Sequence, residues 1–349
     1  MTRLLIPVTS QQQPSRRSEA MFKPSRRPAG ILLLTALLGG LFLAATGCTP
    51  HPAIHHPQQV SRPGNVVRLE YGGTLLRYRP DIDRITFFGT IDGPNLLHTV
   101  DLDRQPPADG SYLFYGGCYT WVAPQRGEYG WVDGKGEKLD WPPDPKMDRG
   151  PMQVIKRSHH SLTARGPVMR SGLREYVTLT MHQDGSATVT RELENTTDEP
   201  KQAAIWMITA VRPGDQIAFK NEVRDKLWSD DPQNEALLDE QLVENRDYLV
   251  LDTTSLTFTD GIKVYADSDP VIAIHTPGWW LLRQGSDSFD GSLRTVNEAP
   301  IGLYLHPGLQ LYEAELYGSL QTIAPGKRIR YSENWQLFPS FKADTAVLP

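Results

Sequence analysis

Short segments in which apolar and polar residues alternate recur along most of this chain, and they constrain its fold more than any other feature. The clearest is EYVTLTMHQDGSATVTRELEN, where Val177, Leu179 and Met181 alternate with polar residues before the turn Asp184-Gly185. The alternation resumes after the turn, so this stretch predicts a β-hairpin.

Similar segments continue from Asn65 to the end of KRIRYSENWQLF, and we expect roughly 16–20 strands separated by turn signals every ~8–12 residues. Only PQNEALLDEQLVENR, residues 232–246, has apolar residues at helical spacing. No fixed-period repeat and no linker divides this part of the chain. The pattern predicts one all-β domain over residues 65–340, an antiparallel sandwich or barrel with one or two short helices, followed by a tail at residues 341–349.

The N-terminal region has the pattern of an export signal. Basic residues at 22–29 precede an apolar run of 16 residues, Ile31–Thr46, which ends in small residues. This run is short for a transmembrane helix, which needs about 20 residues. We therefore predict a signal peptide over residues 1–47, in which Met21 offers an alternative start that would leave residues 1–20 outside the protein.

The segment Ala45-Thr46-Gly47-Cys48 resembles the signal of bacterial lipoproteins. The resemblance implies cleavage before Cys48 and attachment of lipid to its thiol, with an ordinary secretory signal or a membrane anchor as the alternatives. Residues 48–64 are rich in Pro and polar residues and predict a flexible tether. We expect an exported protein that is lipid-anchored to a bacterial membrane, and Thr49 favours the outer membrane, on its periplasmic or surface side.

Charge and cysteine content exclude several classes of function. Without residues 1–47, which hold six basic residues and one acidic residue, 30 Lys and Arg remain against 40 Asp and Glu, a net charge of −10. Such an acidic chain does not suit a nucleic-acid partner. If Cys48 carries lipid, Cys118 has no partner for an intramolecular disulfide, and we interpret it as a small apolar residue in a turn.

The chain lacks the strong signatures of catalysis and metal binding. There is no G-x-S-x-G elbow, phosphate-binding glycine loop, H-E-x-x-H or C-x-x-C motif. The histidines of the tether offer no preorganised geometry, and His159-His160 would point to opposite faces of a strand. We expect neither a metal nor a cofactor.

Aromatic residues are more informative. The segment GGCYTWVAPQRGEYGWVDGKGEKLDWPPDP contains Trp121, Trp131 and Trp141, with Gln125 and Arg126 between them. Aromatic walls with a few polar groups are typical of a small-ligand pocket. The alternative is that these rings cap one end of a sandwich. The pair Trp279-Trp280 occupies a predicted strand, so one ring points to the core and the other outward, and Trp279 is a further candidate for ligand contact.

Three segments together resemble a known superfamily: GGTLLRYRP…ITFFGTIDGPNLLH, RELENTTDEPKQAAIWMITAV and PGLQLYEAELYGSLQTIAPGKRIRYSENWQL. With GGCYTWVAPQ, they resemble an uncharacterised bacterial family, a domain of unknown function, within the galactose mutarotase-like (aldose epimerase-like) superfamily. The resemblance extends from about Asn65 to Leu337. It implies a β-supersandwich whose concave sheet face holds a carbohydrate-type cleft.

The epimerases of that superfamily use a pair of histidines and a glutamate for acid–base chemistry on the sugar. Their first histidine would follow the turn Asn195–Pro200, but this chain has Trp206-Met207-Ile208-Thr209 there, and no His occurs between His182 and His275. Glu313 and Glu315 share one face of a strand and are candidate carboxylates, and His275 is a candidate partner for them.

These observations leave three hypotheses. The first is an exported, lipid-anchored protein that binds a carbohydrate or polyol and contacts the membrane through its lipid, with no evident catalysis. The second is a sugar epimerase, mutarotase or lyase that uses a carboxylate of the cleft. As an epimerase or a mutarotase, the protein would be an aldose epimerase-like isomerase. The third is a structural lipoprotein of the cell envelope.

Overall fold

The computed structural model describes residues 66–105, 112–132, 135–139, 141–245, 248–288 and 290–340, which lie within one compact unit. The predicted signal peptide, Cys48, the tether and the tail at residues 341–349 lie outside the described residues, so they stay predictions. Within the described residues, no helix has the length and hydropathy needed to cross a membrane.

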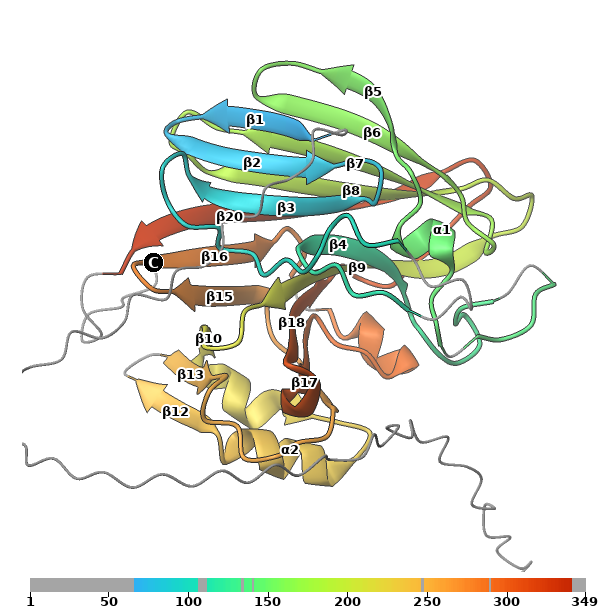
Figure 1. The fold of residues 1–349 in the computed structure, drawn as a ribbon. Helices are drawn as coiled ribbons and strands as arrows, with labels where there is room; N and C mark the ends of the chain where they lie inside the picture. Colours follow the sequence, from blue (N-terminus) through green and yellow to red (C-terminus); the bar gives the residue numbers. More distant parts are fainter. Residues whose placement is uncertain are drawn as a thin grey trace, which may run out of the picture. The chain divides into compact units, whose positions relative to one another are not determined.

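Two antiparallel sheets make up the fold, and we name them the front sheet and the back sheet (Figure 1). The front sheet contains, in spatial order, β1 (Val67–Tyr71), β2 (Thr74–Arg79), β3 (Arg84–Thr90), β4 (Cys118–Ala123), β9 (Lys201–Val211), β18 (Leu311–Tyr317), β17 (Ile301–His306), β14 (Ile262–Ala266) and β11 (Leu227–Trp228), with β19 (Gln321–Ile323) also paired to β9. The back sheet contains β12 (Leu242–Asn245), β13 (Tyr248–Asp252), β10 (Gln216–Lys220), β15 (Val271–Thr276), β16 (Trp279–Gly285), β20 (Arg328–Pro339), β8 (Ala187–Asn195), β7 (Leu173–Met181), β6 (Ser161–Val168) and β5 (Gln153–Arg157). The predicted antiparallel all-β fold is confirmed.

The clearest hairpin of the sequence forms as predicted. β7 pairs with β8 so that Leu179 lies opposite Val189, and both side chains are fully buried. Gly185 supplies the turn with a φ of +84°, a conformation that a residue with a Cβ rarely adopts. The alternation of apolar and polar residues therefore determines both the pairing and the buried face.

The core lies between the two sheets. Front-sheet residues such as Cys118, Met207 and Leu316 face it and are fully buried, as are Leu281 and Trp335 of the back sheet. Cys118 thus packs as an apolar residue, in agreement with its interpretation, although in a strand rather than in the turn.

Buried ion pairs cross this core. Arg191 bonds Asp83 Oδ1 at 2.9 Å and Glu175 Oε1 at 2.8 Å, and all three side chains are at most 3% exposed. Arg283 of β16 pairs with Glu333 and also donates to the backbone oxygens of Ala314 and Met207 in the front sheet. A charge buried in this way requires such partners, because an unpaired charge in the interior is strongly destabilising.

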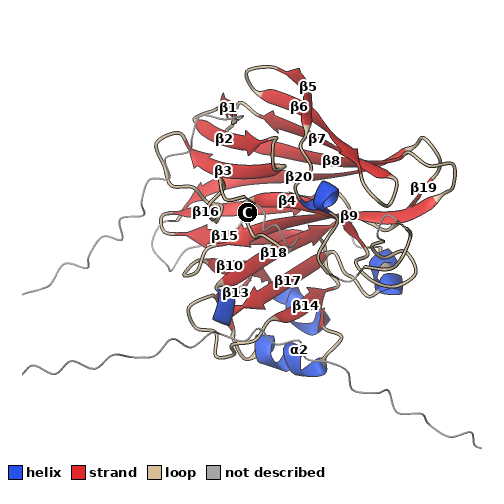
Figure 2. Ribbon diagram, turned by 45° about the vertical axis from the view of Figure 1, so that its right-hand side comes forward, coloured by secondary structure: helices blue, strands red, loops and turns tan. Residues whose placement is uncertain are grey.

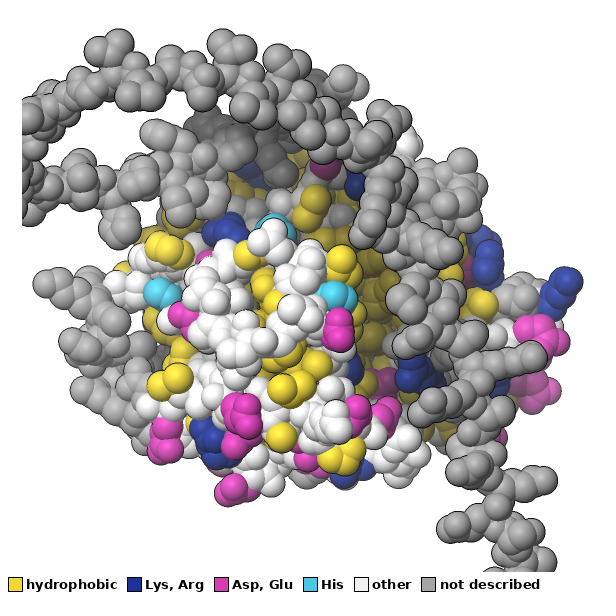
Figure 3. Space-filling model, turned by 60° about the horizontal axis from the view of Figure 1, so that its bottom comes forward, with side chains coloured by type: hydrophobic (Ala, Val, Ile, Leu, Met, Phe, Trp, Pro, Cys, Tyr) yellow, Lys and Arg dark blue, Asp and Glu magenta, His cyan; other side chains and the backbone are white. Residues whose placement is uncertain are grey.

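Helices are few and short, and α2 lies below the strands in Figure 2. They are α1 (Pro145–Asp148), α2 (Pro232–Asp239) and the 3-10 helices η1 (Asn221–Lys226), η2 (Ser292–Val296) and η3 (Pro307–Leu309). The predicted helix over residues 232–246 is wrong beyond Asp239, because Leu242–Asn245 forms β12 and pairs with β13. The end of the molecule that carries α2 shows apolar, acidic and basic side chains intermixed on its surface (Figure 3).

Candidate functional site

The outer face of the front sheet, which points away from the back sheet, gathers the aromatic and acidic side chains of interest. Strand register places Trp121 of β4, Trp206 of β9 and Tyr317 of β18 in one row across three neighbouring strands. Tyr119 and Glu315 flank Ile208 in the next row. Because side chains alternate along a strand, these residues share one face, which we call the aromatic–carboxylate face.

The rings of this face pack tightly on one another. Trp206 stacks on Tyr317 with centroids 5.2 Å apart and an interplanar angle of 13°, and it meets Trp121 edge to face at 5.2 Å. Trp131 packs edge to face against Trp121, with ring centroids 5.4 Å apart. The indole nitrogen of Trp131 donates to the backbone oxygen of Val122 at 2.7 Å. Such contacts stabilise each pair by about 0.5–1.5 kcal/mol beyond burial.

Exposure distinguishes the three predicted loop tryptophans. Trp121 is 3% exposed and Trp131 is 6% exposed, whereas Trp141 is 53% exposed. Trp141 lies edge to face against Tyr112 at 4.8 Å and against Trp121 at 6.0 Å. The sequence pattern favoured Trp121 over Trp131 and Trp141 as a ligand contact. In the structure, Trp141 is the ring of this cluster that is exposed to solvent.

Three carboxylates meet on the aromatic–carboxylate face. Glu313 accepts a hydrogen bond from the Tyr119 hydroxyl, and Glu315 accepts one from the Tyr317 hydroxyl at 2.9 Å. The third is Glu298, whose Oε1 accepts from the backbone N–H of Gln125 at 3.2 Å. Glu298 precedes β17 and has no periodic signal in the sequence, so sequence reasoning missed it.

Burial changes the acidity of these groups. Burial, followed by the neighbouring Glu315, raises the pKa of Glu313 to about 7. Burial likewise raises the pKa of Glu298 to about 7, against the opposing effect of Lys263. The phenol of Tyr119 has its pKa raised by burial and by Glu313, so it keeps its proton. Glu298 and Glu313 thus have pKa values close to neutral pH, and Glu313 lies beside a phenol hydroxyl. Such groups can exchange protons with a bound ligand.

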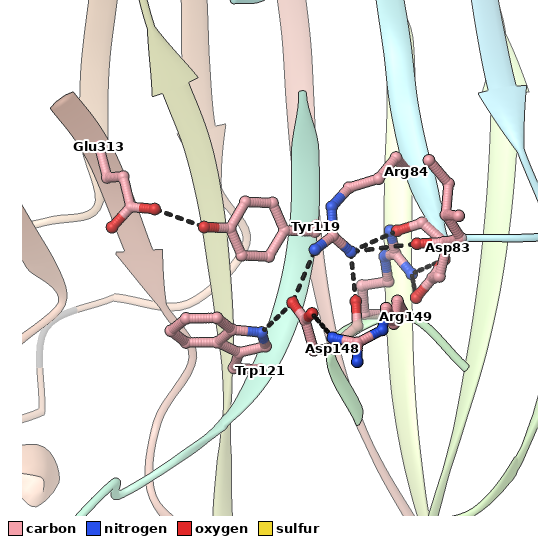
Figure 4. Close-up of polar contacts among 9 residues, drawn as sticks. Asp83, Arg84, Tyr119, Trp121, Asp148, Arg149 and Glu313 are labelled. Carbon is pink, nitrogen blue, oxygen red and sulfur yellow. Dashed lines mark hydrogen bonds and ion pairs between the residues drawn. The ribbon is translucent and has the colours of Figure 1, made fainter. Parts of the chain in front are cut away.

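A second polar cluster supports the aromatic row from the side of β3 (Figure 4). Asp148 of α1 accepts on Oδ1 from Arg84 at 2.7 Å and from the indole nitrogen of Trp121 at 3.2 Å. Its Oδ2 accepts from Arg149 at 3.3 Å, and the Arg84 guanidinium lies 4.0 Å from the centre of the Tyr119 ring. Asp148 therefore holds the orientation of Trp121, and neither it nor Arg84 was a candidate from the sequence.

Lys263 of β14 brings a cation to the opposite side of the face. Its ammonium bonds the Glu315 carboxylate and contacts the Tyr317 hydroxyl at 3.2 Å. The same ammonium lies over the ring of Trp206 at 4.8 Å. The side chain is 25% exposed, so this end of the face is more open than the row of tryptophans.

The structure unites most, but not all, of the predicted site residues. Gln125 is half-buried with its backbone beside Glu298, while Arg126 is exposed. His275 and Trp279 belong to the back sheet instead. His275 packs against Trp280 on its outer surface, with ring centroids 4.6 Å apart, and Trp279 packs on the main core. The geometry thus separates His275 and Trp279 from Glu313 and Glu315.

The described part of the structure contains two cavities near strands β2, β4 and β9. One, of about 260 Å³, lies behind Trp131, between Val122, Met147 and Lys201. The other, of about 440 Å³, lies beside Arg79 and Arg149. Trp131 lines the first cavity, and neither cavity is lined by Trp206, Glu313 or Glu315. Among the described residues, no group of three or more His, Cys, Asp or Glu side chains is arranged to hold a metal ion.

This architecture is that of galactose mutarotase-like proteins, as comparison with solved structures shows. The chain is similar to a galactose mutarotase-like protein from Clostridium acetobutylicum, with 10% identity, a TM-score of 0.51 and coverage of 79% of this chain and 95% of that one. A galactose mutarotase-like protein from Lactobacillus casei ATCC 334 matches at 10% identity and a TM-score of 0.50 over 78% of this chain and 100% of that one. The Slr1438 protein from Synechocystis sp. PCC 6803 matches at 13% identity and a TM-score of 0.53 over 80% and 97%.

The galactose mutarotase-like fold implied by the sequence resemblance is therefore confirmed. No protein-family model matches the chain, and no curated protein matches it. At identities of 10–13%, these similarities establish the fold alone.

Proposed function

We propose that this protein binds a carbohydrate on the aromatic–carboxylate face. The observation that carries the proposal is the row Trp121–Trp206–Tyr317 beside the carboxylates of Glu313 and Glu315 on one sheet face. Aromatic faces pack against the C–H faces of a sugar ring, and carboxylates accept hydrogen bonds from its hydroxyl groups. The fold is similar to that of galactose mutarotase-like proteins, and this similarity supports the proposal of a sugar-type ligand.

A sugar would reach this face from its exposed margins. Trp121 and Trp206 are at most 4% exposed, while Trp141 is 53% exposed and rests against Trp121. We expect the sugar to contact Trp141 first and to reach the inner rings as Trp141 and Tyr112 move aside. Trp141 is thus the residue at which truncation affects binding with the smallest effect on folding.

Calorimetric titration of the full chain with a panel of mono- and oligosaccharides tests the proposal. Trp141→Ala should weaken binding about tenfold or more, equivalent to about 1.4 kcal/mol. Tyr71→Ala is the matched control, because Tyr71 is 43% exposed on β1, away from the site. Absence of binding across the panel, or equal losses in both variants, would reject this function.

A second candidate function is proton transfer to a sugar, in an epimerase, mutarotase or lyase. The specific observation is the Glu313 carboxyl, with its pKa raised to about 7, hydrogen-bonded to Tyr119. Polarimetry on freshly dissolved aldoses would detect catalysed mutarotation, which Glu313→Gln should abolish while Glu199→Gln, on an exposed turn, should not. If wild type and Glu313→Gln give the same rate as buffer, Glu313 has no role in mutarotation.

We further propose that the protein is exported and anchored by lipid on Cys48, on the strength of the N-terminal pattern. Growth of expressing bacteria with a labelled fatty acid should label the chain, and Cys48→Ser should remove the label. Cys118→Ser serves as the control, since a buried core thiol is no acylation site. An unlabelled wild-type chain would argue against the anchor.

A further inference from the structure

The Lys263 ammonium occupies an aromatic cage within the proposed sugar site. It lies 4.8 Å from the ring centre of Trp206, 5.1 Å from that of Tyr265 and 5.8 Å from that of Tyr317. The Glu315 carboxylate bonds it from the side. Faces of Trp and Tyr rings attract cations through their quadrupoles, so three rings and a carboxylate form a receptor for an ammonium group.

Polar atoms around this cage lack partners. Among the described residues, Glu315 Oε1, Glu298 Oε2 and Trp206 Nε1 are buried without a hydrogen-bond partner. A buried polar atom without a partner destabilises the folded protein by about 1–3 kcal/mol. A ligand that forms a hydrogen bond with such an atom would recover this free energy. Two of the three are acceptors, which fits a ligand rich in N–H and O–H donors.

The charge balance also favours a cation. The Glu315 carboxylate faces the Lys263 ammonium, while Arg84 is paired with Asp148. The pKa values of Glu298 and Glu313 are raised to about 7, so these two groups add negative charge as they ionise, and a bound ammonium group favours their ionised forms. At the rim, Asp230 raises the pKa of Tyr265 and Arg126 lowers it, so these two charges have opposite effects there. A sugar that carries a carboxylate or phosphate would be repelled here, whereas a sugar that carries an ammonium group would be attracted.

Glycine at position 302 shapes the cage floor. A Cβ at Gly302 would lie 2.5 Å from Glu315 Oε2 and 3.0 Å from the Tyr317 ring. Without that Cβ, the carboxylate and the ring settle over β17 and enclose the ammonium. The cage thus depends on residues of β9, β14, β17 and β18 together.

We propose that the cage recognises the ammonium group of an amino sugar, and that Lys263 is an internal occupant which this ligand displaces. The inference rests on the proposed carbohydrate-binding function and specifies its substrate class. The ligand's ammonium takes the place of the Lys263 ammonium over the three rings and donates to Glu315 and Glu298. Its hydroxyl groups bond the remaining acceptors of the face.

Calorimetry with glucosamine, N-acetylglucosamine, glucose and glucuronate, below the pKa of the glucosamine amine, tests the substrate class. Glucosamine should bind about tenfold or more tightly than glucose, and glucuronate should bind most weakly. Galactosamine and galactose form a second matched pair. Ethanolamine supplies the ammonium without the ring, and its binding as tightly as glucosamine would overturn the assignment to a sugar.

The outcomes separate this inference from the proposed function. Equal affinity for glucose and glucosamine would overturn the inference and leave carbohydrate binding intact. No binding of any sugar would overturn both. A preference for glucosamine that Glu315→Gln removes, while Glu199→Gln keeps it, would support the cage as its source.

Displacement of Lys263 has its own test. Lys263→Met removes the internal ammonium from the cage and should increase the affinity for glucosamine. The matched variant Lys220→Met, which changes an exposed lysine at the end of β10, should leave the affinity unchanged. Acetylation of wild-type protein followed by mass spectrometry avoids any loss of folding in the variant. Because the amine of glucosamine also consumes the reagent, the labelling of Lys263 is compared with that of the exposed Lys220 in the same sample. The ratio of Lys263 to Lys220 labelling should rise in the presence of glucosamine; a ratio that is unchanged or reduced would overturn the displacement.

Discussion

Substitution of the buried carboxyl group Glu298 by glutamine should make stability less dependent on pH. Glu298 is 4% exposed, and its pKa rises from 4.5 to about 7 in the folded protein, first because of burial. The side-chain amide oxygen of glutamine can replace the carboxyl oxygen Oε1 that accepts from the backbone N–H of Gln125. It removes the ionisation and replaces Oε2 by an NH2 group. The NH2 group does not titrate, so the pH-dependent part of the difference reports the cost of charging this site.

The sign and size of the effect follow from proton linkage. Between pH 4.5 and about 7, the folded protein retains a proton on Glu298 that the unfolded chain has released. The folded state therefore binds more protons, and the stability of the wild type falls as the pH rises through this window. Each unit between the two pKa values corresponds to about 1.4 kcal/mol in the free energy of unfolding. From acid to alkaline pH, the free energy of unfolding of Glu298→Gln should therefore rise by about 3 kcal/mol relative to that of the wild type.

Urea denaturation at about pH 4.5 and about pH 8 measures this difference in the free energy of unfolding. The contributions of other titrating groups largely cancel, since only the change in the difference between variant and wild type is used. Glu199→Gln, on an exposed turn, should give a difference that is the same at both pH values. A Glu298→Gln difference that stays constant, or that grows toward acid pH, would refute the reasoning.

Three further predictions concern the core and the cage. Arg191→Met should lower the free energy of unfolding by about 3–5 kcal/mol in urea, because it leaves two buried carboxylates without their cation, and a loss below about 1 kcal/mol would contradict the ion-pair assignment. Gly302→Ala should displace the Glu315 carboxylate and reduce the preference for glucosamine over glucose in calorimetry, and an unchanged preference would show that the close contact is relieved elsewhere. The Cys118 thiol is fully buried, with its pKa raised by burial to about 11, so a thiol reagent should modify it only on unfolding, and rapid modification of the folded protein would contradict this environment.

Local patterns predicted the strands well because each strand buries alternate residues. The hairpin at 175–195 and the shared face of Glu313 and Glu315 both follow from a period of two. The same local reasoning extended the helix at 232–246 too far, because Leu242 has an apolar side chain that suits either a helix or a strand. Its pairing with Leu251 of β13 decided in favour of the strand.

The candidate site was predicted only in part. Trp121, Trp131 and Gln125 were found from an unusual loop composition, and the carboxylates Glu313 and Glu315 from the family resemblance. Glu298 reaches Gln125 across a separation of 173 residues, and no local signal reports such a contact. His275 was a reasonable candidate by residue type, but the chain places it on the back sheet.

The amino-acid sequence by itself determines that this chain builds an antiparallel β-sandwich, because side-chain alternation and turn residues act over a few positions. It also determines that an aromatic loop and a pair of glutamates are present. Only the tertiary structure decides that Lys263 lies within reach of Trp206 and Glu315, or that Asp148 orients Trp121. Those contacts depend on strand order and register between distant segments, and burial at the place where they meet sets the charge and acidity of the site.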